Sequence, residues 1–600
     1  MMDISTLKTL FLTTVFMLLG CLEIQAQTFI LPPTGYPMTI KLDEAGTLPD
    51  RITKNELYKI SKLKIIGEIN GTDLRVIREM AGKDAWGNDT DGILSVLDLS
   101  EARIVKGGDY WIYGNDYSTS KDKIGYCLFD GCSGLTSITL PPLVTEIGES
   151  AFSGCSGLTS ITLPSRVTKI GNSAFSYCRG LTSLTLSSGV AEIGNDAFAS
   201  CGLKEVSIYV NGDLETYLAK DHPNIGVECS IKYYLNDKEI NNVVIPSNVT
   251  SLGCYAFQNS SLTSITLPSS LASIGDCAFK NCSSLASINF SSGLTSIGRS
   301  AFFGCRGLTS LTLPSSLTSI GDGAFENCSS LTNIVLPSSL GSIGDFVFSK
   351  CSSLTSITLP SRVTKIGNSA FYGCSGLTNV TLPSCINSIG SHAFEGCSGL
   401  ASLTFPSSLI SIGSSAFSSC SSLTSLILPS GLNSIGSYAF AECRKLTSLT
   451  LSPSLTSIAD YAFSGCSNIA SLILPLGVTK IGDYAFSDCS RLTSLTIPSS
   501  VTSLGDYAFK NCSSLQSIYV SWSIPISVGK TFYAVDKSKC TLYVPLGTEQ
   551  DYLLADVWGN FWNIIEYNPT GIDKVTTSTD AKELSRYSVN GQRLSAPAKG

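Results

Sequence analysis

Residues 158–180 read Leu-Thr-Ser-Ile-Thr-Leu-Pro-Ser-Arg-Val-Thr-Lys-Ile-Gly-Asn-Ser-Ala-Phe-Ser-Tyr-Cys-Arg-Gly, and close copies of this stretch recur every 23 residues. The phenylalanine of the unit stands at positions 129, 152, 175 and 198 and, after an interval of 59 residues, at twelve positions from Phe257 to Phe509. A fixed period of this length is typical of a solenoid, in which each coil buries its apolar edge only against its neighbours. The repeat therefore predicts a stack of coils rather than a set of globular domains.

Each unit begins with the alternation of a β-strand. In residues 158–163 the leucine and isoleucine side chains are expected to face inward, while Ser160 and Thr162 face solvent. Pro164 ends the strand because proline has no amide hydrogen to donate, and Gly171 marks a turn without room for a side chain. We therefore expect an α/β repeat solenoid of 23-residue coils, with a parallel β-sheet along one face and short helical turns.

The column directly after the turn glycine is rich in Asp, Asn and Ser, as at Asn172, Asp276 and Asp483. Aspartates at a fixed period raise the hypothesis of a calcium site, because Ca²⁺ prefers oxygen ligands. The same residue types cap the amino ends of helices by accepting hydrogen bonds from free backbone N–H groups. Interchange with Ser437 and Arg299 favours the cap. We expect no metal and no other cofactor.

A second column holds cysteine, from Cys132 to Cys512, in a chain with 22 cysteines. So many cysteines in an exported chain suggest disulfides, and a coil rise of about 4.8 Å lies within the Cα separation that a disulfide allows. Residues in one register, however, present parallel Cβ directions, which is a poor geometry for pairing. We therefore expect a ladder of buried free thiols that act as small apolar groups.

The charge balance and the motif content exclude several classes of function. A net charge of −7 with only 14% charged residues argues against a basic surface that follows phosphates, so nucleic acid is not an expected partner. The two histidines, His222 and His392, are expected to be exposed rather than catalytic. The sequence has no glycine-rich phosphate loop, His-Glu-x-x-His motif or Gly-x-Ser-x-Gly elbow. We expect no enzymatic activity.

The first residues have the pattern of a secretory signal peptide. Lys8 precedes an apolar run over residues 10–20, and the small Ala26 provides a cleavage position. In an alternative reading, residues 18–21, Leu-Leu-Gly-Cys, resemble a lipobox whose Cys21 would carry a lipid. No later stretch reaches the roughly 20 apolar residues of a membrane span. We expect an extracellular or outer-surface protein that meets a membrane only through an anchor at Cys21.

The repeat varies in quality along the chain. Residues 60–65 and 94–99 keep the apolar spacing of the repeat strand, and residues 73–81 between them have helical spacing. Within the interrupted interval, residues 209–234 read as a short helix followed by a strand. Downstream, residues 540–545 read as a final strand. Four aromatic residues are expected to close the last coil, namely Tyr552, Trp558, Phe561 and Trp562.

These observations give the expected domain organisation. It comprises a signal peptide over 1–26, a degenerate capping region over 27–126, a first repeat array over 127–203, an insertion over 204–244, a second array over 245–520, a carboxy-terminal cap over 521–567 and a polar tail over 568–600.

The repeat unit Leu-Thr-Ser-Ile-Thr-Leu-Pro-Ser-Ser-Val-Thr-Ser-Ile-Gly-x-x-Ala-Phe-x-x-Cys resembles the BspA-like class of bacterial leucine-rich repeats, over about two thirds of the chain. The residues around 240–246 and 540–547 look like segments that accompany these repeats in surface proteins of the Bacteroidetes type. Residues 587–595 resemble the start of a carboxy-terminal sorting domain. The resemblance implies a leucine-rich-repeat stack and a surface or secreted adhesin-like protein.

The implied partners are proteins of a host matrix or of another cell. The alternative is a glycan-binding or envelope-organising surface module. Uniform columns cannot mark one site by themselves, so positions that interrupt the columns, and the outward Ser and Thr columns, are the candidates for ligand binding. The candidate residues are Ser160, Thr162, Ser310, Thr312, Asn333, Ser356, Thr358, Asn379, Thr381, Tyr519, Tyr233 and Tyr234.

Overall fold

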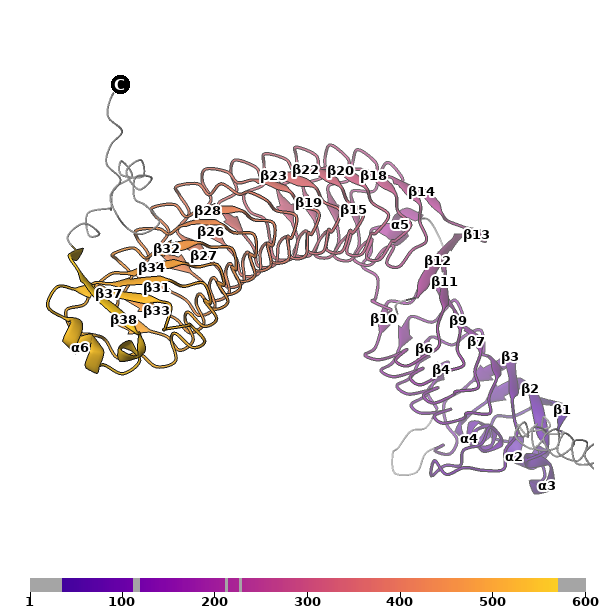
Figure 1. Ribbon diagram of the computed structural model, residues 1–600. Helices are drawn as coiled ribbons and strands as arrows, with labels where there is room; N and C mark the ends of the chain where they lie inside the picture. Colours follow the sequence, from indigo (N-terminus) through magenta and orange to yellow (C-terminus); the bar gives the residue numbers. More distant parts are fainter. Residues whose placement is uncertain (1–34, 112–118, 211–213, 226–228, 570–600) are drawn as a thin grey trace, which may run out of the picture. The chain divides into compact units, whose positions relative to one another are not determined.

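The computed structural model describes residues 35–111, 119–210, 214–225 and 229–569, and these form two compact units. The first unit runs to Tyr209 and includes residues 224–229, and the second comprises residues 210–223 and the chain from Ser230 onward. Each unit is a stack of parallel strands (Figure 1), which confirms the predicted solenoid. The predicted signal peptide, Cys21 and the tail from residue 570 lie outside the described residues.

The first unit begins with the degenerate coils that the apolar spacing predicted. Strands β1 (Tyr36–Lys41), β2 (Ile60–Ile69) and β3 (Val96–Ile104) pair in parallel, and helix α4 (Gly71–Met80) lies between β2 and β3 in sequence. Two short helices, α2 (Leu48–Arg51) and α3 (Lys54–Leu57), precede β2.

A buried arginine joins α4 to the first regular coil. The Arg78 guanidinium is 2% exposed, and its Nη1 donates to the carbonyl oxygens of Cys127 and Leu128, both at 2.8 Å. These bonds compensate the cost of taking the charge out of water. The degenerate region is thereby held to the array by charge-assisted hydrogen bonds.

The regular coils of the first unit carry two sets of strands. We call the strands with the Ser-Ile-Thr pattern the front strands, and the two-residue strands that follow them in each coil the side strands. The front strands are β5 (Ser137–Thr139), β7 (Ser160–Thr162), β9 (Ser183–Ser187) and β11 (Glu205–Val210), and the side strands are β4 (Lys123–Ile124), β6 (Glu146–Ile147), β8 (Lys169–Ile170) and β10 (Glu192–Ile193).

The second unit repeats the same coil from β14 onward. Its front strands are β14 (Asn242–Val244), β16 (Ser264–Thr266), β18 (Ser287–Asn289), β20 (Ser310–Thr312), β22 (Asn333–Val335), β23 (Ser356–Thr358), β25 (Asn379–Thr381), β28 (Ser425–Ile427), β30 (Ser448–Thr450), β32 (Ser471–Ile473), β34 (Ser494–Ile497) and β36 (Ser517–Val520). Its side strands are β15 (Ser251–Leu252), β17 (Ser273–Ile274), β19 (Ser296–Ile297), β21 (Ser319–Ile320), β24 (Lys365–Ile366), β26 (Ser388–Ile389), β27 (Ser411–Ile412), β29 (Ser434–Ile435), β31 (Ser457–Ile458), β33 (Lys480–Ile481) and β35 (Ser503–Leu504).

The core of each coil is a stacked phenylalanine, and we call this column the phenylalanine ladder. Successive rings lie nearly parallel, with centroids between 5.0 Å for Phe371–Phe394 and 5.8 Å for Phe325–Phe348 in the second unit. These four side chains are 0% exposed. Offset stacking at this distance is favourable for aromatic pairs, so the ladder adds ring contacts to the burial of apolar area.

The cysteine column lies beside the phenylalanine ladder, and its members are buried as predicted except for the half-buried Cys201. From Cys155 onward, the thiols of the column donate to the carbonyl oxygen of the phenylalanine one coil earlier, as Cys155 does to Phe129 at 3.0 Å and Cys374 to Phe348 at 3.0 Å. The cysteine therefore satisfies a buried carbonyl in addition to filling space. Burial raises the pKa of Cys374 to about 12, which keeps the thiol protonated.

The segment that carries Ala-Phe is a series of turns, and helices occur only in the end regions and the insertion among the described residues. Two residues per coil take a left-handed backbone conformation, as Ser173 (φ +51°) and Tyr177 (φ +58°) do. Gly171 permits the close stacking of coils, because a Cβ atom there would lie 2.4 Å from the amide nitrogen of Glu149. The predicted requirement for glycine at this turn is confirmed.

The aspartate column is not a helix cap, so the expected capping role was wrong. The Oδ1 atom of Asp483 accepts a hydrogen bond from the backbone N–H of Asp506, one coil later, at 2.8 Å. Asn172 makes the same bond to Asn195 at 2.9 Å. The column is a ladder of hydrogen bonds between successive coils, and the sequence of a single repeat does not predict such bonds. Among the described residues, no group of three or more His, Cys, Asp or Glu side chains is placed to hold a metal ion.

The predicted helix and strand of the interrupted interval are confirmed as α5 (Leu214–Leu218) and β12 (Ser230–Leu235), and β13 (Lys238–Glu239) follows. This segment packs on the first coil of the second unit. The rings of Tyr217 and Tyr233 are 6% and 2% exposed, and the Tyr233 ring meets Phe257 edge to face at 5.7 Å. Two tyrosines thus continue the phenylalanine ladder where the repeat begins again.

The carboxy-terminal end differs from expectation in two respects. Strand β37 (Thr541–Pro545) is not the final strand, because β38 (Asn563–Tyr567) pairs with it after α6 (Glu549–Leu554) and the 3₁₀ helix η1 (Trp558–Asn560). Trp562 does not close the coil, because its side chain is 83% exposed. The other three aromatic residues close the stack as expected, with Tyr552 and Trp558 at 0% and Phe561 at 2% exposure.

None of the helices in the described part of the chain combines the length and the apolar character needed to cross a bilayer.

Candidate functional site

The front strands present two exposed columns of hydroxyl groups. In β7 the buried Ile161 is flanked by the exposed Ser160 and Thr162, and β20 and β23 repeat the pattern. Parallel pairing in register places equivalent residues of neighbouring coils side by side. The candidate pairs that meet in this way are Ser310 with Asn333, Ser356 with Asn379, and Thr358 with Thr381. Thr312 pairs instead with Val335.

A third hydroxyl column has a structural role. The hydroxyl of Thr355 donates to the carbonyl oxygen of Thr332 at 3.2 Å, and that of Thr378 donates to Thr355 at 3.0 Å. These bonds join each coil to the coil before it. The columns of Ser160 and Thr162 therefore hold the hydroxyls that are better placed to meet a ligand.

The interruptions of the front columns differ in character. Asn333 and Asn379 are exposed and keep the face polar. Tyr519 is half-buried, and its ring stacks on Tyr543 of the next strand at 4.4 Å. Burial and the neighbouring Tyr543 phenol raise the pKa of Tyr519 to about 12, so the hydroxyl remains a hydrogen-bond donor at neutral pH.

Four further interruptions were missed from the sequence. They are apolar side chains at the position that Thr162 occupies in β7, and all are strongly exposed: Val244 at 73%, Val335 at 51%, Ile427 at 69% and Ile473 at 56%. Aligning the units at the 23-residue period would have shown β-branched apolar residues in a threonine column. Isolated exposed apolar residues are ordinary, but these lie on one aligned face.

The Tyr233 assignment was wrong as a surface candidate, because its ring is buried and its hydroxyl donates to the carbonyl oxygen of Gln258 at 3.4 Å. The adjacent Tyr234 is half-buried and lies on β12. Alternation along the strand turns one tyrosine into the core and the next toward the surface. Only Tyr234 of this pair remains a candidate.

The two histidines lie far apart in the sequence, and each contacts a different residue. The expectation for His222 was wrong, since it is half-buried, packs against the Tyr217 ring at 4.1 Å, and has its pKa lowered by burial. Its Nε2 lies 2.9 Å from the carbonyl oxygen of Tyr217. His392 is exposed as expected, with Nδ1 2.5 Å from Oε2 of Glu395. Neither contact places a nucleophile beside the imidazole.

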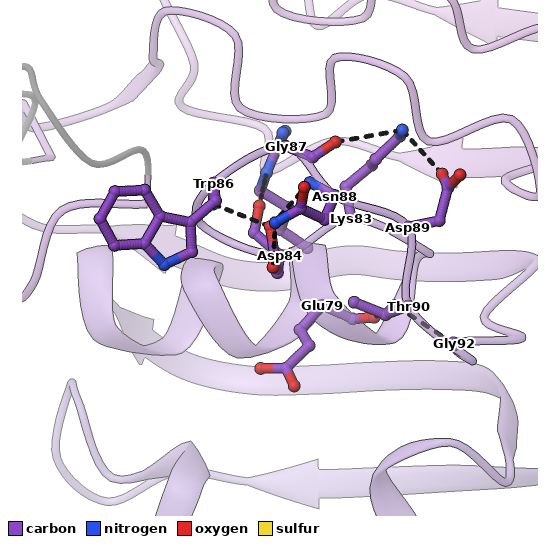
Figure 2. A network of polar contacts seen from close by, with 10 residues as sticks. Glu79, Lys83, Asp84, Trp86, Gly87, Asn88, Asp89, Thr90 and Gly92 are labelled. Atoms are coloured by element: carbon purple, nitrogen blue, oxygen red, sulfur yellow. Dashed lines mark hydrogen bonds and ion pairs between the residues drawn. The ribbon is translucent and has the colours of Figure 1, made fainter.

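A hydrogen-bonded loop after α4 displays an exposed tryptophan (Figure 2). Asp84 Oδ1 accepts from the backbone N–H groups of Trp86 and Asn88, both at 2.8 Å. Lys83 bridges the other side, with its Nζ 3.2 Å from the Gly87 oxygen and 2.7 Å from Asp89 Oδ1. The Trp86 side chain is 71% exposed. Desolvation raises the pKa of Asp84, but the hydrogen bonds that its carboxylate accepts outweigh this and lower the pKa, so the carboxylate stays ionised.

A protein-family model matches the repeats of this chain. The family model described as BspA type Leucine rich repeat region (6 copies) matches residues 116–222, 230–352, 318–447 and 411–539, which together make up more than half of the chain. Among proteins of curated function, no relative matches the chain.

Several solved structures are similar in sequence. A leucine-rich repeat protein from Bacteroides ovatus is 27% identical, covers 60% of this chain and 87% of its own, and has a TM-score of 0.42. A leucine rich cell surface protein from Faecalibacterium prausnitzii is also 27% identical with the same coverage and a TM-score of 0.35. The leucine rich repeat protein of T. pallidum is 36% identical over 30% of this chain and 77% of its own, with a TM-score of 0.26.

Proposed function

Since the chain belongs to the BspA-type leucine-rich repeat family, we propose that it is an exported, non-enzymatic surface scaffold whose front strands bind proteins of a host matrix or of another cell. The observation that carries the proposal is the register of the front face. Within each set of paired front strands, exposed side chains at equivalent positions lie side by side, as in β20 with β22 and β23 with β25, which offers a partner an aligned surface.

The apolar interruptions are where we place the affinity. Ile427, Ile473 and Tyr519 occupy the threonine column of β28, β32 and β36, near the end of the second unit. Binding energy at protein interfaces is concentrated in a few desolvated apolar or aromatic side chains, while surrounding polar groups supply complementarity. The serines and threonines around them form the polar surround in this proposal.

The test restores the consensus at these positions. A triple variant, Ile427→Thr, Ile473→Thr and Tyr519→Thr, keeps the strand pattern and removes the apolar groups. We expect it to bind matrix proteins at least about tenfold more weakly than the native chain, which corresponds to about 1.4 kcal/mol. Surface-plasmon resonance with immobilised fibronectin, fibrinogen and laminin would measure the difference.

A matched control changes three front-column residues in the uniform part of the array, Thr312→Ser, Thr358→Ser and Thr381→Ser. This control keeps each hydroxyl, so its binding should equal that of the native chain. Equal binding by the native chain and the consensus variant would remove the apolar interruptions from the proposal. Absence of binding to any matrix or cell-surface protein would overturn the proposed function itself.

Deleting the interrupted interval is a poor test of binding. Its Tyr217 and Tyr233 are buried, and the Tyr217 hydroxyl donates to the Ala256 carbonyl oxygen at 3.1 Å. The deletion would therefore expose the first coil of the second unit. Point substitution at the half-buried Tyr234 keeps that core intact.

A glycan-binding function is the second candidate, and Trp86 favours it. Sugars pack against exposed aromatic faces, and this tryptophan is 71% exposed in a loop whose backbone donates two hydrogen bonds to Asp84. Trp86→Ala should abolish retention on a glycan array if this loop binds sugar. Trp562→Ala, at the other strongly exposed tryptophan, is the control that should leave retention unchanged.

Export is part of the proposal and has its own measurement. Mass spectrometry of the mature amino terminus separates two forms, a chain that begins at Gln27 and a chain that begins at a lipid-modified Cys21. Recovery of an unprocessed chain from the producing cell would contradict export.

A further inference from the structure

Four successive coils near the end of the second unit carry a tyrosine directly after the aspartate column. Tyr438, Tyr461, Tyr484 and Tyr507 stack face to face, with centroid separations of 4.4, 4.7 and 4.8 Å. We call this column the tyrosine ladder. Tyr438 is 43% exposed and the other three are half-buried, so the phenol edges are open to solvent.

The coil does not need a tyrosine at this position. Ser369 and Ser415 occupy it in other coils with the same left-handed backbone, at φ +52° and +53°. The tyrosines adopt this conformation at φ values from +55° to +60°, which costs about 1–2 kcal/mol for a residue with a Cβ atom. Serine adopts the same backbone conformation in other coils, so the backbone does not require the aromatic ring. A partly exposed aromatic column that the coil does not require is better explained by recognition than by folding.

The stacking decides which part of each ring a ligand can reach. Interplanar angles of 6°, 5° and 20° show that neighbouring rings cover the faces inside the ladder. Sugar recognition needs open faces, so the interior of the ladder is not suited to it. What remains is a ridge of aromatic edges and phenol hydroxyls that repeats once per coil.

Charges mark one end of the ridge. The Nζ atom of Lys510 lies 5.6 Å from the Tyr484 ring centre and 5.7 Å from that of Tyr507, and Lys530 lies 5.6 Å from Tyr507. Within the described part of the chain, neither lysine has a carboxylate within ion-pair distance. A hydrogen bond to Tyr507 raises the pKa of Lys530, which keeps it charged.

Negatively charged aspartates line the rest of the ridge. Asp460, Asp483 and Asp506 are exposed in the adjacent column and use one carboxylate oxygen to bind the next coil. A uniformly anionic polymer would be repelled along this column while being attracted at one end. The charge pattern therefore favours a mostly neutral ligand that is acidic at one end.

We propose that the tyrosine ladder binds a proline-rich segment of a partner protein in the polyproline II conformation, with acidic residues of that segment over Lys510 and Lys530. A polyproline II helix has three residues per turn at about 3.1 Å each, so one turn matches two tyrosine spacings of 4.7 and 4.8 Å. Its carbonyl groups make no internal hydrogen bonds and can accept from the phenols. Proline rings pack against aromatic rows at little entropic cost.

This surface lies on the Ala-Phe turns and does not depend on the front strands, so it goes beyond the function proposed above. The probes are synthetic peptides added to the full chain and followed by fluorescence anisotropy. A proline decamer that ends in two glutamates is compared with the same decamer ending in two lysines and with a Gly-Ser peptide of equal length. A triple-helical Pro-Pro-Gly peptide distinguishes a collagen-like source from a single proline-rich chain.

The main variant replaces all four tyrosines by serine, the residue that other coils carry. We expect at least about thirtyfold weaker binding of the acidic decamer, as for loss of an interface hot spot of about 2 kcal/mol. Tyr461→Phe keeps the ring and removes one donor, and it should weaken binding a few-fold. The pair Lys510→Ala and Lys530→Ala should remove the preference for glutamates over lysines.

Circular dichroism establishes that each variant is folded, and the consensus variant of the front face should bind the decamer normally. The proposal is overturned by any of three results: no decamer binding, equal binding of the Gly-Ser peptide, or decamer binding that survives loss of the four tyrosines. Loss of matrix binding alone would contradict only the function proposed for the front strands.

Discussion

The phenylalanine ladder and the tyrosine ladder obey the same 23-residue period and the same stacking geometry, yet they have opposite relations to solvent. Phe371 and Phe394 stack at 5.0 Å and are 0% exposed, whereas Tyr461 and Tyr484 stack at 4.7 Å with their edges half open. The phenylalanine recurs in every regular coil, whereas the tyrosine occurs in four successive coils and once more at Tyr255. In this solenoid a residue that every coil needs is structural, and one that only some coils carry is a candidate for recognition.

The largest expected effect is a fall in the free energy of unfolding at alkaline pH, where the buried thiols lose their protons. Burial raises the pKa of Cys328, Cys374 and Cys512 to about 12 from an ordinary value of 9.0. Because the folded chain keeps protons that the unfolded chain releases, the free energy of unfolding is unaffected below pH 9 and falls as the pH rises toward 12. Chemical denaturation between pH 8 and 12 measures this slope.

Removing one buried thiol sharpens this prediction. Cys328→Ala should reduce the slope by up to about 1.4 kcal/mol per pH unit, the value for one proton. Thr358→Ser, which removes no titratable group, should leave the slope unchanged. An unchanged slope in the cysteine variant would contradict a protonated interior column.

The next largest effect compares one ring from each ladder. Phe371→Ala leaves a cavity between two neighbouring rings and should lower the free energy of unfolding by about 3–5 kcal/mol. Tyr461→Ser, the matched change in the exposed ladder, should alter it by less than about 1 kcal/mol, because serine adopts the same backbone conformation in other coils and little buried area is lost. Urea denaturation monitored by circular dichroism gives both values. Equal losses would show that the tyrosine ladder is structural as well.

The smallest effect concerns the aspartate column, which directly precedes the tyrosine ladder in sequence. Asp483→Ala removes the acceptor for the Asp506 N–H and should cost about 1 kcal/mol, while Asp483→Asn keeps an acceptor oxygen and should cost less. Added calcium should leave the thermal midpoint of the native chain unchanged. A rise of several degrees with calcium would instead favour the metal hypothesis for this column.

The sequence predicted those parts of the fold that depend on one unit at a time. The alternation around Ile161, the turn at Gly171 and the buried Cys155 follow from burial and backbone geometry within a coil. The role of Asn172 could not be read in this way, because its partner, Asn195, lies a full coil away. A contact between residues 23 apart can be predicted only when the coil rise is known.

The candidate site shows the same limit. Exposure of Ser160 and Thr162 followed from alternation, but Tyr233 was assigned to the wrong face because the strand register in the interrupted interval was unknown. The exposed Ile427 was missed because the units were not compared position by position. Periodicity predicts which face a side chain shares, and only the aligned columns show where that face changes character.

The hydrogen bonds from the thiols to the phenylalanine carbonyls bear on how the chain reaches its folded state. Each bond, such as Cys466 to Phe440 at 3.2 Å, joins residues only 25 or 26 apart, so a coil can close on a finished neighbour without waiting for distant parts of the chain. In an oxidising compartment, every thiol not yet enclosed is open to mispairing. The yield of native protein there therefore depends on two rates: each coil must enclose its thiol faster than that thiol is oxidised.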